Sequence, residues 1–101
     1  MNTLQNKVAY ITGGSKGIGF GIAKNLLDAG MRVAITSRQL SAAEEAAKAL
    51  GGDASKVLAL ESDVSSMASE QKAVQAVLNH FGQLDVLIAN AGVGYFEPIE
   101  S

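Results

Sequence analysis

Thr-Gly-Gly-Ser-Lys-Gly-Ile-Gly, residues 12–19, joins a short apolar run to a segment with helical periodicity. The run before it, residues 7–12, predicts a β-strand, and from Gly17 onward Ile18, Ile22 and Leu26 recur on one helical face. A glycine-rich turn at the entrance of a helix places unpaired backbone N–H groups and partial positive charge where an anion can approach. The stretch therefore predicts a strand–loop–helix unit that can hold a phosphate group.

The same alternation of strand and helix continues along the chain. Further strands are predicted at residues 32–37, 57–60 and 85–89, and further helices at residues 41–50 and 67–81. The apolar residues of the strands follow one another directly, which is typical of parallel strands covered on both faces. The sequence thus predicts an α/β fold, a Rossmann-type doubly wound parallel sheet that is incomplete, with the order βαβαβαβ and strand order 3-2-1-4.

Helix ends are also predicted. Ser41 and Glu44 have the spacing of a capping box at the start of the second helix, and Ser65 or Ser66 is expected to cap the third. Gly82 is expected to end the third helix. The first two helices should cover one face of the sheet and the third the other.

Composition excludes several classes of protein. The 101 residues suffice for one domain, 48% are hydrophobic, and a net charge of -2 gives no field that attracts nucleic acid or an anionic membrane. Cysteine is absent, and His80 is the single histidine, so we expect no metal site. The polar start lacks the apolar core of a signal peptide, and we expect a cytoplasmic protein without membrane contact.

The spacing of the glycines separates three phosphate-binding patterns. Gly13, Gly17 and Gly19 do not match the common dinucleotide pattern Gly-x-Gly-x-x-Gly. Lys16 precedes Gly17, so the ATP-type P-loop, which requires Gly-Lys followed by Ser or Thr, does not fit either. The pattern present is Thr-Gly-x-x-x-Gly-x-Gly.

That pattern resembles the cofactor loop of short-chain dehydrogenases/reductases. Asp63-Val64, after the third predicted strand, resembles the pair of this family that contacts adenine. Asn90-Ala91-Gly92, after the fourth, resembles its Asn-Asn-Ala-Gly motif, with Ala89 in place of the first Asn. The resemblance covers the whole chain and is nearest to ketoacyl-reductase-like members.

The resemblance implies a site for a nicotinamide dinucleotide. Residues 15–18 should face the pyrophosphate, Asp63 should accept from the adenine amino group under cover of Val64, and residues 90–92 should shape the floor below the nicotinamide-side ribose. A helix N-cap or turn residue is the alternative for Asp63. The candidate cofactor-binding residues are Gly13, Ser15, Lys16, Gly17, Ile18, Gly19, Ser37, Arg38, Asp63, Val64, Asn90, Ala91 and Gly92.

The end of the second strand favours NADP over NAD. An NAD enzyme usually offers Asp or Glu to the adenosine ribose at this point, whereas this chain has Ser37 and then Arg38. Arginine suits bidentate contact with a 2′-phosphate, and Lys16 can reach the same phosphate from the other side. The alternative is that both cations are solvated loop charges.

The family's catalytic Tyr-x-x-x-Lys pair is absent, because Tyr10 is followed four residues later by Gly14 and Tyr95 by Ile99. The catalytic serine that follows a fifth strand is absent as well. We therefore expect residues 1–101 to be the NADP-binding half-domain of a longer oxidoreductase that reduces a carbonyl or oxidises an alcohol. The piece alone should be inactive, and the complete protein a homo-oligomer.

Two other functions are weighed against this one. A non-catalytic module that binds a dinucleotide is the alternative, whereas the glycine spacing and residues 90–92 disfavour an S-adenosylmethionine methyltransferase. Because no strand follows to pair with residues 85–89, we also expect the isolated chain to be unstable or to self-associate through that apolar edge.

Overall fold

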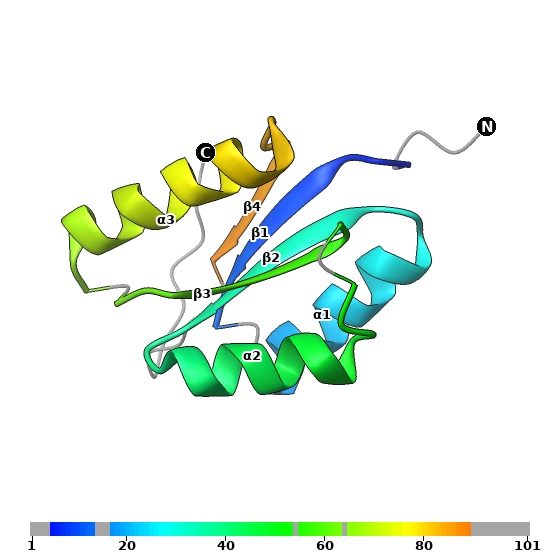
Figure 1. The fold of residues 1–101 in the computed structure, drawn as a ribbon, viewed down its shortest axis with the longest axis horizontal. Coiled ribbons are helices and arrows are strands. Elements are labelled where there is room, and N and C mark those ends of the chain that lie inside the picture. Colours follow the sequence, from blue (N-terminus) through cyan, green and yellow to red (C-terminus); the bar gives the residue numbers. More distant parts are fainter. Residues whose placement is uncertain (1–4, 14–16, 54, 64, 90–101) are drawn as a thin grey trace.

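The structure is a computed structural model and describes residues 5–13, 17–53, 55–63 and 65–89. Strands and helices alternate as predicted (Figure 1). In chain order the elements are β1 (Val8–Thr12), α1 (Gly17–Asp28), β2 (Arg32–Ser37), α2 (Leu40–Ala49), β3 (Val57–Glu61), α3 (Met67–Phe81) and β4 (Val86–Ala89).

The four strands form one parallel sheet in the order β3-β2-β1-β4. Tyr10 of β1 lies level with Ala34 of β2 on one side and with Leu87 of β4 on the other. The predicted fold class and strand order are confirmed. The order reverses direction at β1, since the chain first builds outward through β2 and β3 and then returns to the far side of β1 with β4.

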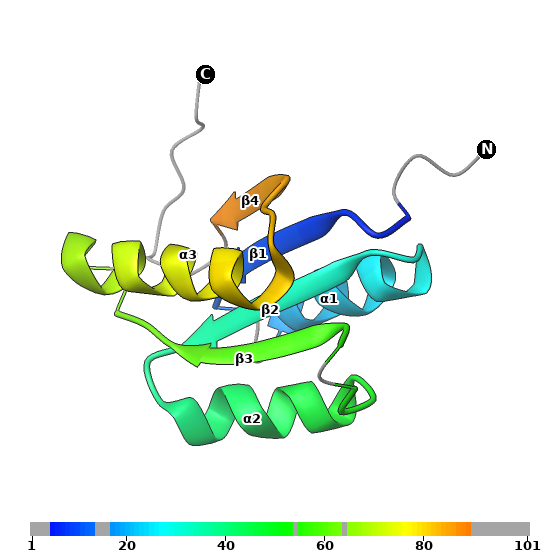
Figure 2. The same cartoon turned by 45° about the horizontal axis from the view of Figure 1, so that its top comes forward.

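Helices cover both faces of the sheet, with α1 and α2 on one face and α3 on the other (Figures 1 and 2). Ile11 and Ile35 pack on the first face with Ala23 of α1 and Ala46 of α2. The opposite face holds a second apolar cluster, formed by Val8, Tyr10 and Ala34 with Ala73 and Val77 of α3. The predicted division of the helices between the two faces is confirmed.

Burial differs between the central and outer strands. Every residue of β1 is buried, as are the four inner residues of β2. In β4, by contrast, Val86 is 39% and Leu87 60% exposed. The expectation of strands covered on both faces therefore holds for the centre of the sheet and fails at β4, because the helices of the described residues pack mainly over β1, β2 and β3.

The predicted capping box of α2 is wrong. The helix already begins at Leu40, and Gln39 occupies the cap position without a side-chain hydrogen bond, so Ser41 lies inside the first turn. At α3 the prediction holds, since Ser66 is the N-cap and its side chain accepts a hydrogen bond from the Ser69 N–H. Gly82 ends α3 in the left-handed conformation, with φ 83°.

Candidate nucleotide-binding site

The carboxyl ends of the four parallel strands meet at one edge of the sheet. Open α/β sheets bind ligands outside this edge, at the point where the strand order reverses. Here that point lies between β1 and β4, where the Thr12 hydroxyl donates a hydrogen bond of 3.4 Å to the Ile88 carbonyl oxygen. Gly13 after β1, Arg38 after β2 and Asp63 after β3 lie at this same edge.

Among the described residues, a left-handed glycine lies at each end of the glycine loop. Gly13 has φ 69° and Gly17 φ 65°, a conformation that residues with a Cβ rarely adopt. A Cβ added at Gly17 would meet nothing within 4 Å, so the backbone conformation and not lack of space favours glycine there. Gly19 is buried in α1, whereas Ile18 is 77% exposed.

The turn after β2 exposes a cation. Ser37, the last residue of the strand, is partly buried, and its Oγ accepts a hydrogen bond of 3.3 Å from the Gln39 N–H. Arg38 is exposed at the edge of the sheet. This turn therefore presents a hydroxyl and a guanidinium group, with no carboxylate between them.

Asp63 follows β3 by one intervening residue and takes part in a turn. Its Oδ1 accepts hydrogen bonds from the Ser65 N–H at 2.9 Å and from the Ser65 hydroxyl at 2.7 Å. These bonds hold the pKa of Asp63 below its usual value, and the positive charge of Arg38 acts in the same direction. Asp63 is thus a turn residue and not the N-cap, which is Ser66. Within the described part of the chain its Oδ2 accepts no hydrogen bond, so this oxygen can receive a donor from a ligand.

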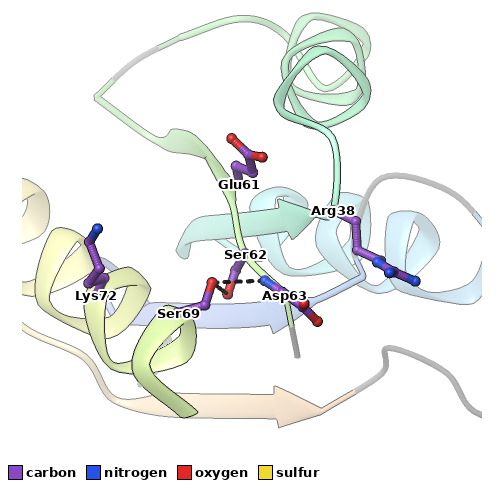
Figure 3. A pocket seen from close by; sticks show the side chains of 6 residues that line it. All are labelled: Arg38, Glu61, Ser62, Asp63, Ser69 and Lys72. Carbon is purple, nitrogen blue, oxygen red and sulfur yellow. Dashed lines mark hydrogen bonds between the residues drawn. The ribbon is translucent and has the colours of Figure 1, made fainter. Parts of the chain in front are cut away.

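A cleft of about 260 Å³ lies beside Asp63 (Figure 3). It brings together two predicted site residues, Arg38 and Asp63. Its other lining residues were not predicted: Glu61, Ser62, Ser69 and Lys72. Glu61 and Ser62 could have been found because they precede Asp63 directly, whereas Ser69 and Lys72 reach the cleft only because α3 folds back over the end of β3.

The remaining predicted residues, Ser15, Lys16, Val64, Asn90, Ala91 and Gly92, lie outside the described residues. Within the described ranges, no three His, Asp or Glu side chains gather as ligands for a metal ion. In those same ranges, no helix has the length and apolar character needed to cross a membrane.

Comparison with known proteins identifies the family. A family model described as short chain dehydrogenase matches residues 7–101. The chain belongs to the short chain dehydrogenase family. Nicotinamide dinucleotides are the cofactors of this family, and the left-handed Gly13 and Gly17 and the open Asp63 Oδ2 suit such a ligand. The resemblance seen in the sequence is confirmed.

Relatives of known activity include both reductases and dehydrogenases. The hydroxynaphthalene reductase arp2 of Aspergillus fumigatus is 36% identical over 98 residues, which are 96% of this chain and 36% of the relative. The D-threitol dehydrogenase of Mycolicibacterium smegmatis is 39% identical over 97 residues, 96% of this chain and 37% of the relative. This chain therefore spans less than two fifths of the length of these two curated relatives.

The solved structures agree with the fold. The 3-ketoacyl-(acyl-carrier-protein) reductase of Brucella melitensis, crystallised in complex with NADH, has 39% sequence identity and a TM-score of 0.77. The match covers 84% of this chain and 34% of that one. The parallel sheet with helices on both faces is thus the N-terminal arrangement of a short chain dehydrogenase.

Proposed function

We propose that this chain is the cofactor-binding part of an NADP(H)-dependent oxidoreductase that reduces a carbonyl or oxidises an alcohol. One observation carries the proposal: the strand order places Gly13, Arg38 and Asp63 at the same carboxyl edge, beside the point where the sheet reverses. A dinucleotide lying across that edge meets backbone amides, a cation and a carboxylate in turn.

Each part of the cofactor is assigned to a part of the chain. The backbone around Ser15–Ile18, at the entrance of α1, holds the pyrophosphate, and Gly13 and Gly19 allow its close approach. Asp63 accepts from the adenine amino group through Oδ2, with Val64 over the ring. Asn90, Ala91 and Gly92 form the floor below the nicotinamide-side ribose. When bound, the dinucleotide supplies or receives the hydride.

Selection of NADP is assigned to the turn after β2 and to Lys16. Ser37 offers no negative charge to a 2′-phosphate, and Arg38 is exposed beside the cleft that contains Asp63. A guanidinium group binds phosphate through two parallel hydrogen bonds, which supports Arg38 as the main phosphate ligand. The Brucella melitensis reductase was crystallised with NADH, so the proposal of NADP rests on Ser37, Arg38 and Lys16 of this chain and not on that relative.

A titration tests both parts of the proposal. The 101-residue chain is titrated with NADPH and with NADH, and binding is followed by nicotinamide fluorescence. We expect NADPH to bind more tightly, and Arg38→Ala to weaken NADPH by about tenfold or more while leaving NADH nearly unchanged. Lys56→Ala is the matched control, since it removes a cation before β3, at the opposite end of that strand. Equal binding of the two cofactors would exclude NADP selectivity. Binding of neither cofactor, by a chain that circular dichroism shows to be folded, would exclude the cofactor site.

A non-catalytic dinucleotide-binding module is the second candidate, and it would use the same glycine loop and the same Asp63. The reading frame downstream of codon 101 separates the two candidates. Continuation into a Tyr-x-x-x-Lys segment supports the oxidoreductase, and its absence supports the binding module. For the complete enzyme we propose a small carbonyl or alcohol substrate, a homo-oligomeric state and a cytoplasmic location.

A further inference from the structure

A polar cluster ties the start of α3 to the ends of two strands. The hydroxyl of Ser69 accepts a hydrogen bond of 2.9 Å from the backbone N–H of Asp63. It also lies 3.3 Å from the hydroxyl of Ser62, the buried residue that follows β3 (Figure 3). Ser69 therefore contacts both residues that lead from β3 into the turn of Asp63.

Glu70 anchors this contact in the core. Its carboxylate accepts hydrogen bonds from the Tyr10 hydroxyl, at 3.1 Å to each oxygen, and from the Ser62 hydroxyl. Tyr10 belongs to the central strand β1 and is fully buried. Burial, together with the negative charge of Glu70, raises the pKa of Tyr10 to about 12, so the phenol keeps its proton and remains a donor at neutral pH. The first turn of α3 is thereby held against β1 and β3 at once.

The Ser69 hydroxyl does not serve to cap or stabilise α3. The cap of α3 is formed by Ser66, whose side chain accepts from the Ser69 N–H at 3.1 Å. The Ser69 hydroxyl instead receives the N–H of Asp63, which lies three residues before the cap and outside the helix. A buried or partly buried backbone N–H needs a partner, and here a side chain supplies it. The bond thus orders the turn rather than the helix.

We propose that Ser69, held in place by Glu70, is a positioning residue that orients Asp63 toward the adenine of the cofactor. The inference rests on the proposed function and adds to it two residues that the sequence motif does not contain. Oδ1 of Asp63 is occupied by Ser65, so only Oδ2 remains for the adenine amino group. Small rotations of the Asp63 backbone move Oδ2 out of hydrogen-bonding range, and the Ser69 hydroxyl restrains that rotation.

The experiment compares three variants of the full 101-residue chain, each under conditions in which it is folded. Ser69→Ala removes the acceptor of the Asp63 N–H, and Ser69→Thr retains a hydroxyl at the same position. Ser66→Ala is the matched control, because it removes the cap of α3 and leaves the Ser69–Asp63 bond. We expect Ser69→Ala to weaken NADPH binding by about fivefold, which is the effect of losing one hydrogen bond. Ser69→Thr should restore most of the lost affinity. Ser66→Ala should change the affinity for NADPH by less than about twofold.

Two further readouts report on Asp63 itself. Amide hydrogen exchange at Asp63 should accelerate in Ser69→Ala and stay slow in Ser66→Ala. The effect of Ser69→Ala should also vanish in an Asp63→Ala background, and with nicotinamide hypoxanthine dinucleotide phosphate, which lacks the adenine amino group. These readouts follow the orientation of Asp63 and not the overall stability of the chain.

The outcomes separate the two proposals. If the unmodified chain binds neither NADPH nor NADH, the proposed function is overturned, and the inference with it. If the unmodified chain binds and Ser69→Ala binds equally well, the inference alone is overturned. If Ser66→Ala and Ser69→Ala weakened NADPH binding equally, the inference would also be overturned, because Ser69 would then act only through the stability of α3.

Discussion

The side chain of Asp85 and the backbone of Val8, 77 residues apart in the sequence, form a hydrogen bond of 2.8 Å between Oδ2 and N–H. The Val8 carbonyl oxygen in turn accepts from the Asp85 N–H at 2.9 Å. The same Oδ2 also accepts from the Gln83 side chain at 2.8 Å. Asp85 therefore aligns the start of β4 with the start of β1, at the edge of the sheet opposite the nucleotide site.

Stability should consequently depend on the charge of Asp85. The bonds from Val8 and Gln83 lower the pKa of Asp85, so the folded state binds its proton less readily than the unfolded state. Its stabilising contribution is therefore complete above the unfolded pKa of about 4 and is lost as the pH falls through the lower, folded pKa. We expect Asp85→Ala to be less stable than the unmodified chain at pH 7, with a smaller loss of stability on acidification.

Urea unfolding at neutral and acidic pH measures this difference. Glu45→Ala is the control, since it removes an exposed carboxylate of α2 that has no part in the sheet. An Asp85→Ala chain whose stability falls with pH as steeply as that of the unmodified chain would show that the bond to Val8 is not the cause.

A side chain at Gly17 should lower the stability of the chain. Its φ of 65° costs a residue with a Cβ about 1–2 kcal/mol, so Gly17→Ala should destabilise the chain by about that amount and weaken NADPH binding by displacing the amides at the helix entrance. Gly21→Ala is the matched control, because Gly21 lies four residues further along α1 and a Cβ there meets nothing within 4 Å. That variant should gain about 0.5–1 kcal/mol. Chemical unfolding and cofactor titration of both variants test the difference, and equal stability of the two would refute the role of the left-handed backbone.

Glu61 should weaken the selectivity for NADP. It pairs in register with Ser37, one strand spacing or about 5 Å away, and lines the same cleft as Arg38. Its negative charge repels a 2′-phosphate at this end of β2. We expect Glu61→Gln to tighten NADPH binding by about twofold at low ionic strength, with no change for NADH. Glu45→Gln serves as the control for loss of an unrelated carboxylate, and parallel changes in both cofactors would argue against an effect on the 2′-phosphate.

The exposed side of β4 should cause the chain to self-associate. Val86 and Leu87 expose 39% and 60% of their surfaces on the outermost strand of the described sheet. Open apolar edges pair with other chains. Leu87→Lys should therefore lower the average mass found by sedimentation at a given concentration. Leu40→Lys is the matched control, since Leu40 is 40% exposed on a helix and has no strand edge to block. A monomeric unmodified chain would rule the prediction out.

Local patterns in the sequence were sufficient for most of the fold. Glycine positions and apolar runs predicted each strand and helix that the structure describes. The βαβ connections predicted the strand order, because right-handed crossovers leave few alternatives. The start of α2 was missed, since Ser41 and Glu44 match a capping box wherever the helix begins. The exposure of β4 was missed as well, because an apolar run of residues does not indicate whether its strand lies at the centre of a sheet or at its edge.

The order of the elements and the edge at which their loops meet follow from local sequence patterns, because periodicity and glycine conformation act over a few neighbouring residues. The side chains that meet at this edge could be identified only from the folded chain: Ser69 binds the Asp63 amide, and Glu70 lies between Tyr10 and Ser62. Tyr10 and Glu70 are 60 residues apart, and their contact depends on how α3 packs across β1 and β3. That packing results from many apolar contacts between distant residues, so no short sequence motif predicts it.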